Sequence, residues 1–314
     1  MLVIRFSALG DVAMLAPVVR AAAEQNPDVS FTMLSQQRFH DLFKDMPSNV
    51  RFQGAEIKKQ SLRDIVSELG SYEFVADMHS VLRSLYIRTA LRLRGAKVAV
   101  IDKGRRDKRH LTRGRHTPLR HTTLRYADVF EELGLTVQLP EATHTEGEGI
   151  GIAPFAAHEG KIYPIERMEG VVEQLSQQGI PVTLFGGGRK EQELLGTWAN
   201  RYPGVRSVAG KHSLAEELAI MRGLRLMVTM DSGNMHLASL VDTRVVSIWG
   251  ATHPYAGFLG YGQRESDCIQ RALDCRPCSI YGNKKCRYGD YRCLDIPAEE
   301  VAERIVKAYH ETEA

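Results

Sequence analysis

The residues best suited to bind a charged ligand lie in a strand–turn–helix–strand pattern late in the chain. Leu226–Met230 predicts a buried strand, residues 234–240 a helix, and Val245–Trp249 a second strand. The turn into the helix consists of Asp231, Ser232 and Gly233. The first N–H groups of a helix have no partner within it, and the helix dipole favours negative charge at that end. The turn therefore predicts a phosphate-binding site.

His236 falls on the first turn of the same predicted helix, where its ring could donate a hydrogen bond to a bound phosphate. The alternative is that Asp231 is only a helix N-cap and His236 an exposed residue. The position of the turn between two strands favours a ligand, because α/β folds bind ligands at the carboxyl ends of their parallel strands.

A second candidate lies at the start of the chain, where residues 2–6 predict a strand and residues 12–24 a helix. The turn between them has a single glycine and does not match the G-x-G-x-x-G pattern of dinucleotide-binding folds. Asp11 follows the carboxyl end of this strand, where a ligand crevice would lie. Its carboxylate could act as a base there, or could simply cap the helix.

Together these stretches resemble glycosyltransferase family 9, the bacterial heptosyltransferases of lipopolysaccharide core assembly. D-S-G-N-M-H-L at 231–237, followed by G-A-T-H-P at 250–254, resembles the donor-sugar signature of the family. S-x-x-G-D at 7–11 is similar to its first signature. The resemblance implies that Asp11 is the catalytic base, that Ser7 and Gly10 lie at the acceptor, and that Thr252 belongs to the donor site with the 231–236 residues.

Two further stretches of the second half extend this resemblance. K-I-Y-P at 161–164 resembles the family's K-x-W-P, which implies that Lys161 contacts the donor, with Tyr163 in place of the usual tryptophan. The glycines at 186–188 follow a predicted strand at 182–185, and glycine lets a ligand approach the backbone closely. We therefore expect Gly186 and Gly187 at the donor. Glu191 resembles the acidic residue that contacts the nucleoside part of the donor.

Residues 103–125 are strongly basic, with nine Lys or Arg and three His against a single Asp. A solvated loop, a nucleic-acid surface, an anionic membrane surface and an acceptor bearing carboxylates and phosphates are all compatible with such a run. The segment contains no Phe, Tyr or Trp, and the first aromatic residue after it is Tyr126. The stacking platform of an RNA-binding site is therefore missing. We expect no nucleic-acid partner, but rather a membrane surface together with an acceptor bound by Arg105, Arg106 and Arg109.

Two other polar residues follow a predicted strand at 74–79 and open a predicted helix at 81–94. His79 and Arg83 either contact the acceptor or solvate the start of the helix. The sequence leaves both interpretations open.

Four of the five cysteines are spaced as C-x2-C, then seven, then six intervening residues: Cys275, Cys278, Cys286 and Cys293. The first pair has the spacing of zinc ligands, and four thiolates could close a structural zinc site. A disulfide and plain reduced thiols remain alternatives. Because all five cysteines lie between Cys268 and Cys293, the chain does not resemble a secreted disulfide scaffold.

Alternating strands and helices over 314 residues predict an α/β protein of two doubly wound, Rossmann-like domains facing a cleft, the GT-B architecture. We expect an acceptor-binding domain at 1–148 and a nucleotide-sugar-binding domain at 149–314. The final helix, residues 297–310, is expected to pack back on the first domain. A net charge of +3 implies no polyanion partner for the chain as a whole. With no apolar run of 18 residues and no signal-peptide pattern, we expect a cytoplasmic protein in peripheral contact with the inner membrane.

The resemblance implies inverting transfer of a heptose, or a related sugar, from a nucleotide-diphosphate donor, ADP-heptose by the family's habit, to a lipopolysaccharide core acceptor. No D-x-D motif occurs, in agreement with a mechanism that needs no metal cofactor. Two alternatives share the expected architecture: a nucleotide-sugar epimerase, and a sugar-nucleotide-binding protein without catalytic activity.

Overall fold

The computed structural model describes residues 1–114, 117–141 and 143–311, and within it the chain forms two compact units. The N-terminal unit comprises Met1–Lys103 and Arg120–Glu141, and the C-terminal unit comprises Gly104–Leu119 and Ala142–Ala314. The chain passes from the first unit to the second at 141/142, a few residues before the predicted 148/149, and Gly104–Leu119 is grouped with the second unit. Within the predicted basic segment and linker, Arg115, His116 and Ala142 lie outside the described residues.

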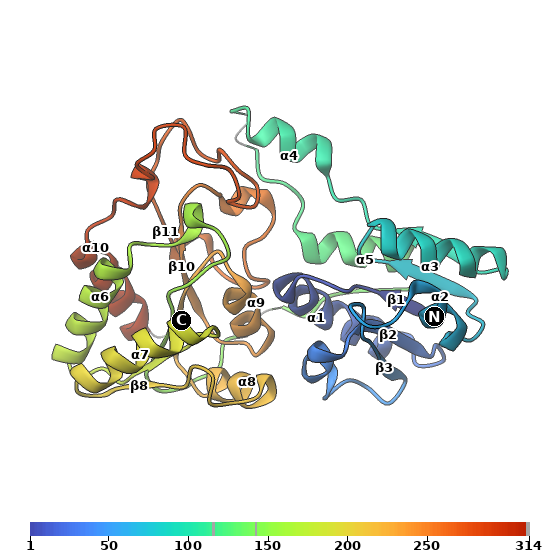
Figure 1. The fold of residues 1–314 in the computed structure, drawn as a ribbon, viewed down its shortest axis with the longest axis horizontal. Helices are drawn as coiled ribbons and strands as arrows, with labels where there is room; N and C mark the ends of the chain where they lie inside the picture. The colour runs from blue at the N-terminus through green and yellow to red at the C-terminus, as the bar shows by residue number, and fades with distance from the viewer. Residues whose placement is uncertain (115–116, 142, 312–314) are drawn as a thin grey trace. The chain divides into compact units, whose positions relative to one another are not determined.

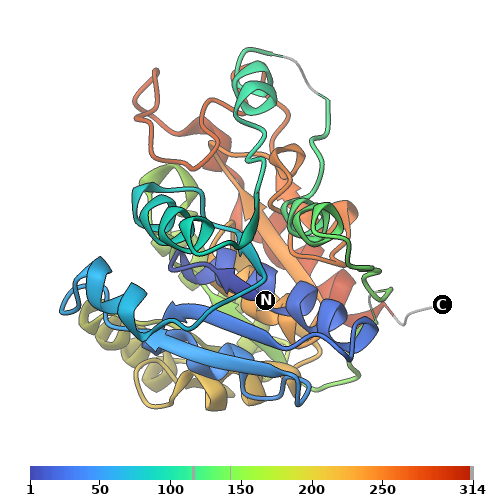
Figure 2. The same cartoon turned by 90° about the vertical axis from the view of Figure 1, so that its right-hand side faces the viewer.

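The N-terminal unit is built on a five-stranded parallel sheet with the order β3-β2-β1-β4-β5. Its strands are β1 Leu2–Ile4, β2 Phe31–Gln36, β3 Val50–Ala55, β4 Phe74–Asp77 and β5 Lys97–Val100. The helical segments of this unit are α1 Leu9–Gln25, η1 Gln37–Phe43, α2 Leu62–Glu68, α3 Leu82–Leu93 and α5 Thr122–Glu132. Helix α1 packs against α5 and helix α2 against α3, so that two pairs of helices accompany the sheet (Figures 1 and 2).

The C-terminal unit is built on a six-stranded parallel sheet with the order β11-β10-β9-β6-β7-β8. Its strands are β6 Ile150–Ala153, β7 Val182–Leu184, β8 Val205–Ser207, β9 Leu226–Met230, β10 Val245–Trp249 and β11 Cys268–Gln270. Its α-helices are α4 Arg105–Leu111, α6 Ile165–Gln177, α7 Arg189–Arg201, α8 Leu214–Arg222, α9 Gly233–Leu240 and α10 Ala298–His310. Short 3₁₀ turns are η2 Glu159–Lys161, η3 Pro254–Ala256, η4 Glu265–Asp267 and η5 Arg292–Leu294.

The strand order of each sheet reverses at one place, and these places locate the ligand crevices. In the first sheet the chain passes outward from β1 to β2 and β3, then returns to β4 on the other side of β1. In the second sheet β6 and β9 are the corresponding neighbours. Doubly wound sheets bind ligands outside the carboxyl ends of the strands at such switch points. The residues after β1, β4, β6 and β9 are therefore the ones to consider.

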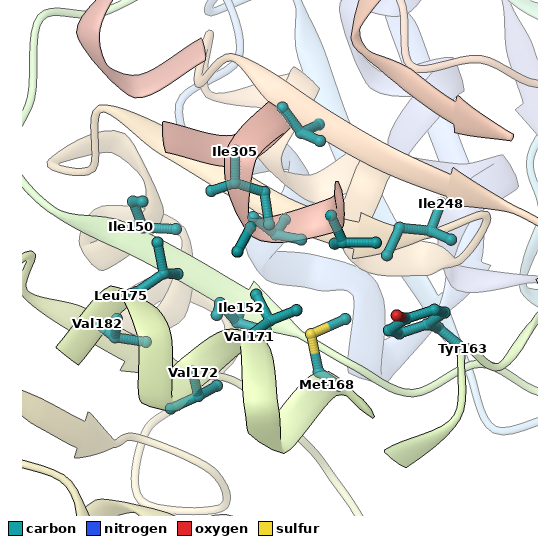
Figure 3. Packing of buried hydrophobic residues seen from close by; sticks show 14 of the residues in the cluster. Ile150, Ile152, Tyr163, Met168, Val171, Val172, Leu175, Val182, Ile248 and Ile305 are labelled. Atoms are coloured by element: carbon teal, nitrogen blue, oxygen red, sulfur yellow. The ribbon is translucent and has the colours of Figure 1, made fainter. Parts of the chain in front are cut away.

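The apolar core of the C-terminal unit packs the helices α6 and α10 against the sheet whose carboxyl edge carries the candidate site. Figure 3 shows Met168, Val171 and Val172 of α6 together with Ile152 of β6 and Ile305 of α10 in one buried cluster. Burying apolar side chains contributes about 25 cal/mol per Å² of surface removed from water.

The final helix belongs to this core. The buried face of α10 consists of Val301, Ala302, Ile305 and Ala308, and it packs against α6. This face completes the core of the second unit, and packing of the final helix on the first domain stays a prediction.

Most predicted elements are present, with a few differences. The short strands β3, β8 and β11 were not predicted, nor was the 3₁₀ segment η1. β3 is mostly half-buried and has little apolar sequence to reveal it. β8 and β11 have three residues each, which is too short for a periodic signal.

Candidate functional sites at the carboxyl edges of the two sheets

Asp11 lies in the first turn of α1 and is oriented by a buried arginine. Nη2 of Arg5 lies 2.6 Å from Oδ2 of Asp11, and the side chain of Arg5 is only 7% exposed. The backbone N–H of Ala8 donates to the same oxygen over 3.1 Å, which is the helix-capping contact that the sequence offered as an alternative. Among the described residues no hydrogen bond or ion pair reaches Oδ1 of Asp11, so this oxygen can accept a proton from a ligand.

His79 lies beside this carboxylate and holds the loop after β1. The backbone N–H of Phe6 donates to Nδ1 of His79 over 3.4 Å, and Nε2 lies 3.3 Å from Oγ of Ser7. Burial and the nearby charge of Arg5 lower the pKa of His79 to about 4, so the ring is neutral at physiological pH. Because Nδ1 accepts from the backbone, we place the ring proton on Nε2, where it donates to Ser7. The Ser7 hydroxyl hydrogen is then available to a ligand.

In the C-terminal unit, the predicted donor residues Lys161 and Asp231 form a buried ion pair. Nζ of Lys161 lies 2.7 Å from Oδ2 of Asp231, and the side chains are 14% and 5% exposed. Asp231 follows β9 directly and Lys161 ends the loop after β6, so the pair lies at the switch point of the sheet. Lys161 thereby neutralises a carboxylate that would otherwise repel a phosphate at the start of α9.

Two buried hydroxyl groups beside this pair have no hydrogen-bond partner among the described residues. They are Oγ of Ser232, the residue at the N-cap position of α9, and Oγ1 of Thr252, which follows β10; Ser232 makes no side-chain capping hydrogen bond. Unpaired buried polar atoms are uncommon and costly in folded proteins, and a ligand is one explanation for them. His236 is buried in the first turn of α9 rather than exposed. Gly233 is the first residue of α9, so its N–H has no partner within the helix.

The loops that carry these residues are joined by backbone contacts. The N–H of Ala251 donates to the carbonyl oxygen of Gly160 over 2.7 Å, and a Cβ atom at Gly250 would lie only 2.4 Å from that oxygen. The buried guanidinium of Arg276 donates from Nη2 to the carbonyl oxygens of Trp249 and Thr252, over 3.2 and 2.9 Å. The position of Thr252 is therefore fixed by a side chain that lies 24 residues away in the sequence.

The remaining predicted donor residues have structural contacts of their own. Tyr163 is fully buried, and its hydroxyl donates to the carbonyl oxygen of Ile296 over 2.7 Å. Burial raises the pKa of Tyr163 to about 12, so the hydroxyl stays protonated and acts as a core anchor. Glu191 accepts from the N–H of Gly187 over 2.7 Å and so braces the glycine loop at 186–188. A role for Gly186, Gly187 and Glu191 at the nucleoside stays a prediction.

The predicted acceptor residues are distributed over both units. Ser7 and His79 lie together with Asp11 in the first unit, while Arg83 lies on α3, exposed. Helix α4 carries three exposed arginines in the second unit: Arg105, Arg106 and Arg109. Gly10 lies within α1, one residue before Asp11.

A buried lysine attaches α4 to the second unit. Nζ of Lys108 lies 4.2 Å from the ring centroid of Phe258 and 5.9 Å from that of Tyr281, both within cation–π range. The N–H of Leu119 donates to the carbonyl oxygen of Tyr255 over 2.9 Å. These contacts explain why a segment predicted in the first domain packs on the second.

All five cysteines are free thiols in the structure, so the disulfide alternative is not formed. Burial raises the pKa of Cys293 to about 11 and keeps that thiol protonated. Over the described ranges, no group of three or more His, Cys, Asp or Glu side chains is arranged to hold a metal ion. A structural zinc site at Cys275, Cys278, Cys286 and Cys293 stays a prediction.

Sequence reasoning missed Arg5 and Arg276, the two buried arginines that position Asp11 and Thr252. Arginine is rarely buried, and the sequence analysis singled out neither residue. The available signals were slight: Arg5 interrupts the apolar strand at 2–6, and Arg276 stands inside the C-R-P-C motif.

The chain is similar to known proteins over most of its length. Residues 96–289, more than half of its length, match the family model described as glycosyltransferase family 9 (heptosyltransferase). The lipooligosaccharide heptosyltransferase 2 of Campylobacter jejuni is 22% identical over 310 residues, covering 95% of this chain and 96% of the relative. The lipopolysaccharide heptosyltransferase 1 of Pseudomonas aeruginosa is 23% identical over 337 residues, covering 95% and 92%.

Solved structures are similar over the same extent. E. coli heptosyltransferase WaaC with ADP gives a TM-score of 0.73 at 19% identity, covering 98% of this chain and 99% of that one. The same protein with ADP-2-deoxy-2-fluoro heptose gives 0.71 at 20% identity, covering 98% of each chain. At such identities the likeness concerns the fold, and it confirms the predicted GT-B fold of two doubly wound domains. No helix in the described part of the chain is long and apolar enough to cross a membrane.

Proposed function

Because the chain belongs to glycosyltransferase family 9, we propose that it transfers a heptose from ADP-heptose to the core of a lipopolysaccharide precursor. Membership makes the protein a glycosyltransferase of heptosyltransferase type, whereas its donor, its acceptor and inversion at the anomeric carbon are the proposal. The names of the full-length relatives support the acceptor class. The ADP and the ADP-2-deoxy-2-fluoro heptose bound in the similar E. coli structures support the donor.

One observation in this chain carries the donor half of the proposal. Ser232 and Thr252 present buried, unpartnered hydroxyl groups next to a neutralised Lys161–Asp231 pair at the N-terminus of a helix. A diphosphate supplies acceptors for such hydroxyls and for the first N–H groups of α9. The positive end of the helix and Lys161 stabilise the charge that develops on the leaving diphosphate. In other transferases a metal ion stabilises this charge. The proposed mechanism uses these groups in its place and needs no metal cofactor.

The acceptor half rests on Asp11. In the proposed reaction, an acceptor hydroxyl gives its proton to Oδ1 of Asp11 as its oxygen attacks the anomeric carbon of the heptose. The bond from that carbon to the diphosphate oxygen breaks in the same displacement and releases ADP. A single displacement inverts the anomeric carbon. Arg5 holds the carboxylate in place through Oδ2, and Ser7 offers its hydroxyl hydrogen to the acceptor.

The test is acceptor-dependent release of ADP. We expect the purified protein to release ADP from ADP-heptose only when a lipopolysaccharide core acceptor is present, with one heptose gained per ADP by mass spectrometry. An epimerase would convert the sugar nucleotide without an acceptor, and a binding protein would release no ADP. Either outcome contradicts the proposal. Product stereochemistry by NMR would decide between inversion and retention.

A further inference from the structure

The outward face of α3 is apolar, although nothing in its own unit covers it. The buried face of this helix is formed by Ser84, Ile87 and Leu91. At 3.6 residues per turn, positions 82, 86, 89 and 93 fall on the opposite side of the helix. Leu82 and Leu93 there are 83% and 85% exposed, which are extreme values for leucine. Helix α3 (teal) can be followed in Figures 1 and 2.

More apolar surface adjoins these two leucines. Tyr86 is 47% exposed and Leu85 42% exposed, so four large apolar side chains face solvent on one helix of 12 residues. Single exposed leucines are ordinary, but a contiguous exposed stripe marks an interaction surface. The helix is therefore amphipathic in an unusual way, with one apolar face toward the sheet and a second toward the outside.

The charges along this stripe have one sign. Helix α3 contains no Asp or Glu, and its exposed Arg83 and Arg92 flank the leucine stripe on its two sides. From Leu82 to Lys103 the chain holds six Lys or Arg and a single Asp, which leaves the surroundings positive. Apolar side chains between arginines fit the headgroup region of a bilayer, where the apolar groups enter the acyl boundary and the guanidinium groups bind lipid phosphates.

We infer that the outward face of α3 is a membrane-docking surface that binds bilayers containing anionic lipids. This inference deepens the proposed function and rests on it for the biological partner, because an enzyme acting on a glycolipid must reach the bilayer that holds its acceptor. Two leucines at opposite ends of the helix and Tyr86 between them supply the apolar contact. Arg83 and Arg92 supply the preference for anionic lipid.

The inference is tested by co-sedimentation of the full chain with vesicles, without any substrate. We expect binding to vesicles of phosphatidylethanolamine and phosphatidylglycerol, and much weaker binding to pure phosphatidylcholine. Replacing both leucines (Leu82→Ser with Leu93→Ser) should lower the partition coefficient by roughly tenfold or more. Arg83→Gln with Arg92→Gln should lower binding to the anionic vesicles and bring it close to the phosphatidylcholine value.

A matched control is Tyr288→Ser, because Tyr288 is a large apolar side chain, 50% exposed, in the C-terminal unit. It should leave vesicle binding unchanged. Melting temperatures of all variants, measured in parallel, should stay near wild type because none of these side chains is buried.

Three outcomes overturn the inference. They are no vesicle binding by the wild type, equal loss in the Tyr288 control, and full binding by the double leucine variant. If light scattering shows a dimer that the leucine variant dissociates while vesicle binding persists, a second copy of the chain covers this face instead. Failure of the proposed function is recognised separately, by absence of heptose transfer to a soluble, deacylated acceptor, which requires no vesicle.

Discussion

Asp11 has one carboxylate oxygen engaged and one available, and this asymmetry gives a direct test of its role. Asp11→Asn retains the shape of the side chain but removes the basic oxygen, so we expect kcat to fall by about 10²–10⁴ while the Kd for ADP is unchanged. Arg5 would lose its ionic partner, so we also expect a lower melting temperature. Steady-state kinetics well below that temperature separate the two effects.

The matched control for this substitution is Asp128→Asn. Asp128 also pairs with an arginine in the same unit, but its pair with Arg120 is about half exposed. Exposed pairs contribute little to stability, so kcat and the melting temperature should both stay near wild type. Near-normal kcat in Asp11→Asn would leave Asp11 as a helix cap, and the base would have to be sought elsewhere.

His79 gives the protein a pH dependence of stability with a definite sign. Its pKa is about 4 in the folded state, below the ordinary histidine value of 6.5, because burial and Arg5 disfavour the charged ring. Between those two values the unfolded chain binds a proton that the folded chain refuses, so stability falls as the pH drops from 6.5 to 4. Above pH 6.5 His79 has no such effect.

The measurement compares thermal melts of the wild type and His79→Gln across this window. Gln keeps a polar side chain but does not titrate, so the variant should lose less melting temperature between pH 6.5 and pH 4. Parallel curves for the two proteins would contradict the shifted pKa. The comparison removes every contribution that the two proteins share.

At the scale of elements, the sequence revealed that α4 is basic but not that this helix packs on the second unit. Its charge was evident from the sequence, but the attachment of Lys108 to Phe258 and Tyr281 spans about half of the chain, and no local pattern reveals it. The strand–turn–helix around Asp231 was predictable because Asp-Ser-Gly punctuates two apolar runs. Helical periodicity alone did not show that Leu82 and Leu93 face outward, since a helix with apolar residues all round has no obvious inner side.

The exposed arginines of α4 provide the test at this scale. Reversing Arg105, Arg106 and Arg109 to Glu should raise the KM for an anionic acceptor and leave the Kd for ADP unchanged. The physical reason is the loss of charge attraction to acceptor carboxylates and phosphates. The assay uses a deacylated, soluble acceptor, so that membrane binding does not enter the result.

A control with the same change in net charge reverses Lys58, Lys59 and Arg63, which are exposed in the first unit. If this triple substitution raises the acceptor KM as much, the effect belongs to the net charge of the protein. If the α4 substitutions alter only the affinity for ADP, α4 is not an acceptor-binding helix.

At the scale of the whole molecule, each unit has its own parallel sheet and its own carboxyl-edge cluster. The residues described as contacting Asp11 belong to the first unit. The residues that form the Lys161–Asp231 pair belong to the second. Under the proposed function, the nucleotide would bind and stabilise the second unit, and the acceptor would engage the first. This arrangement makes donor binding measurable without acceptor or turnover.

ADP alone should therefore stabilise the protein through the hydroxyl groups that lack partners in its absence. A ligand at 100 times its Kd adds about 2.7 kcal/mol to the free energy of unfolding, which raises the melting temperature by several degrees. Ser232→Ala combined with Thr252→Val removes both hydroxyls and should reduce this shift. Thr243→Val is the control, because its hydroxyl is equally buried but already donates to the carbonyl oxygen of Met221 over 2.8 Å. That variant should lose stability at every ADP concentration and yet keep the full shift. A full shift in the Ser232 and Thr252 double variant would place the nucleotide elsewhere on the chain.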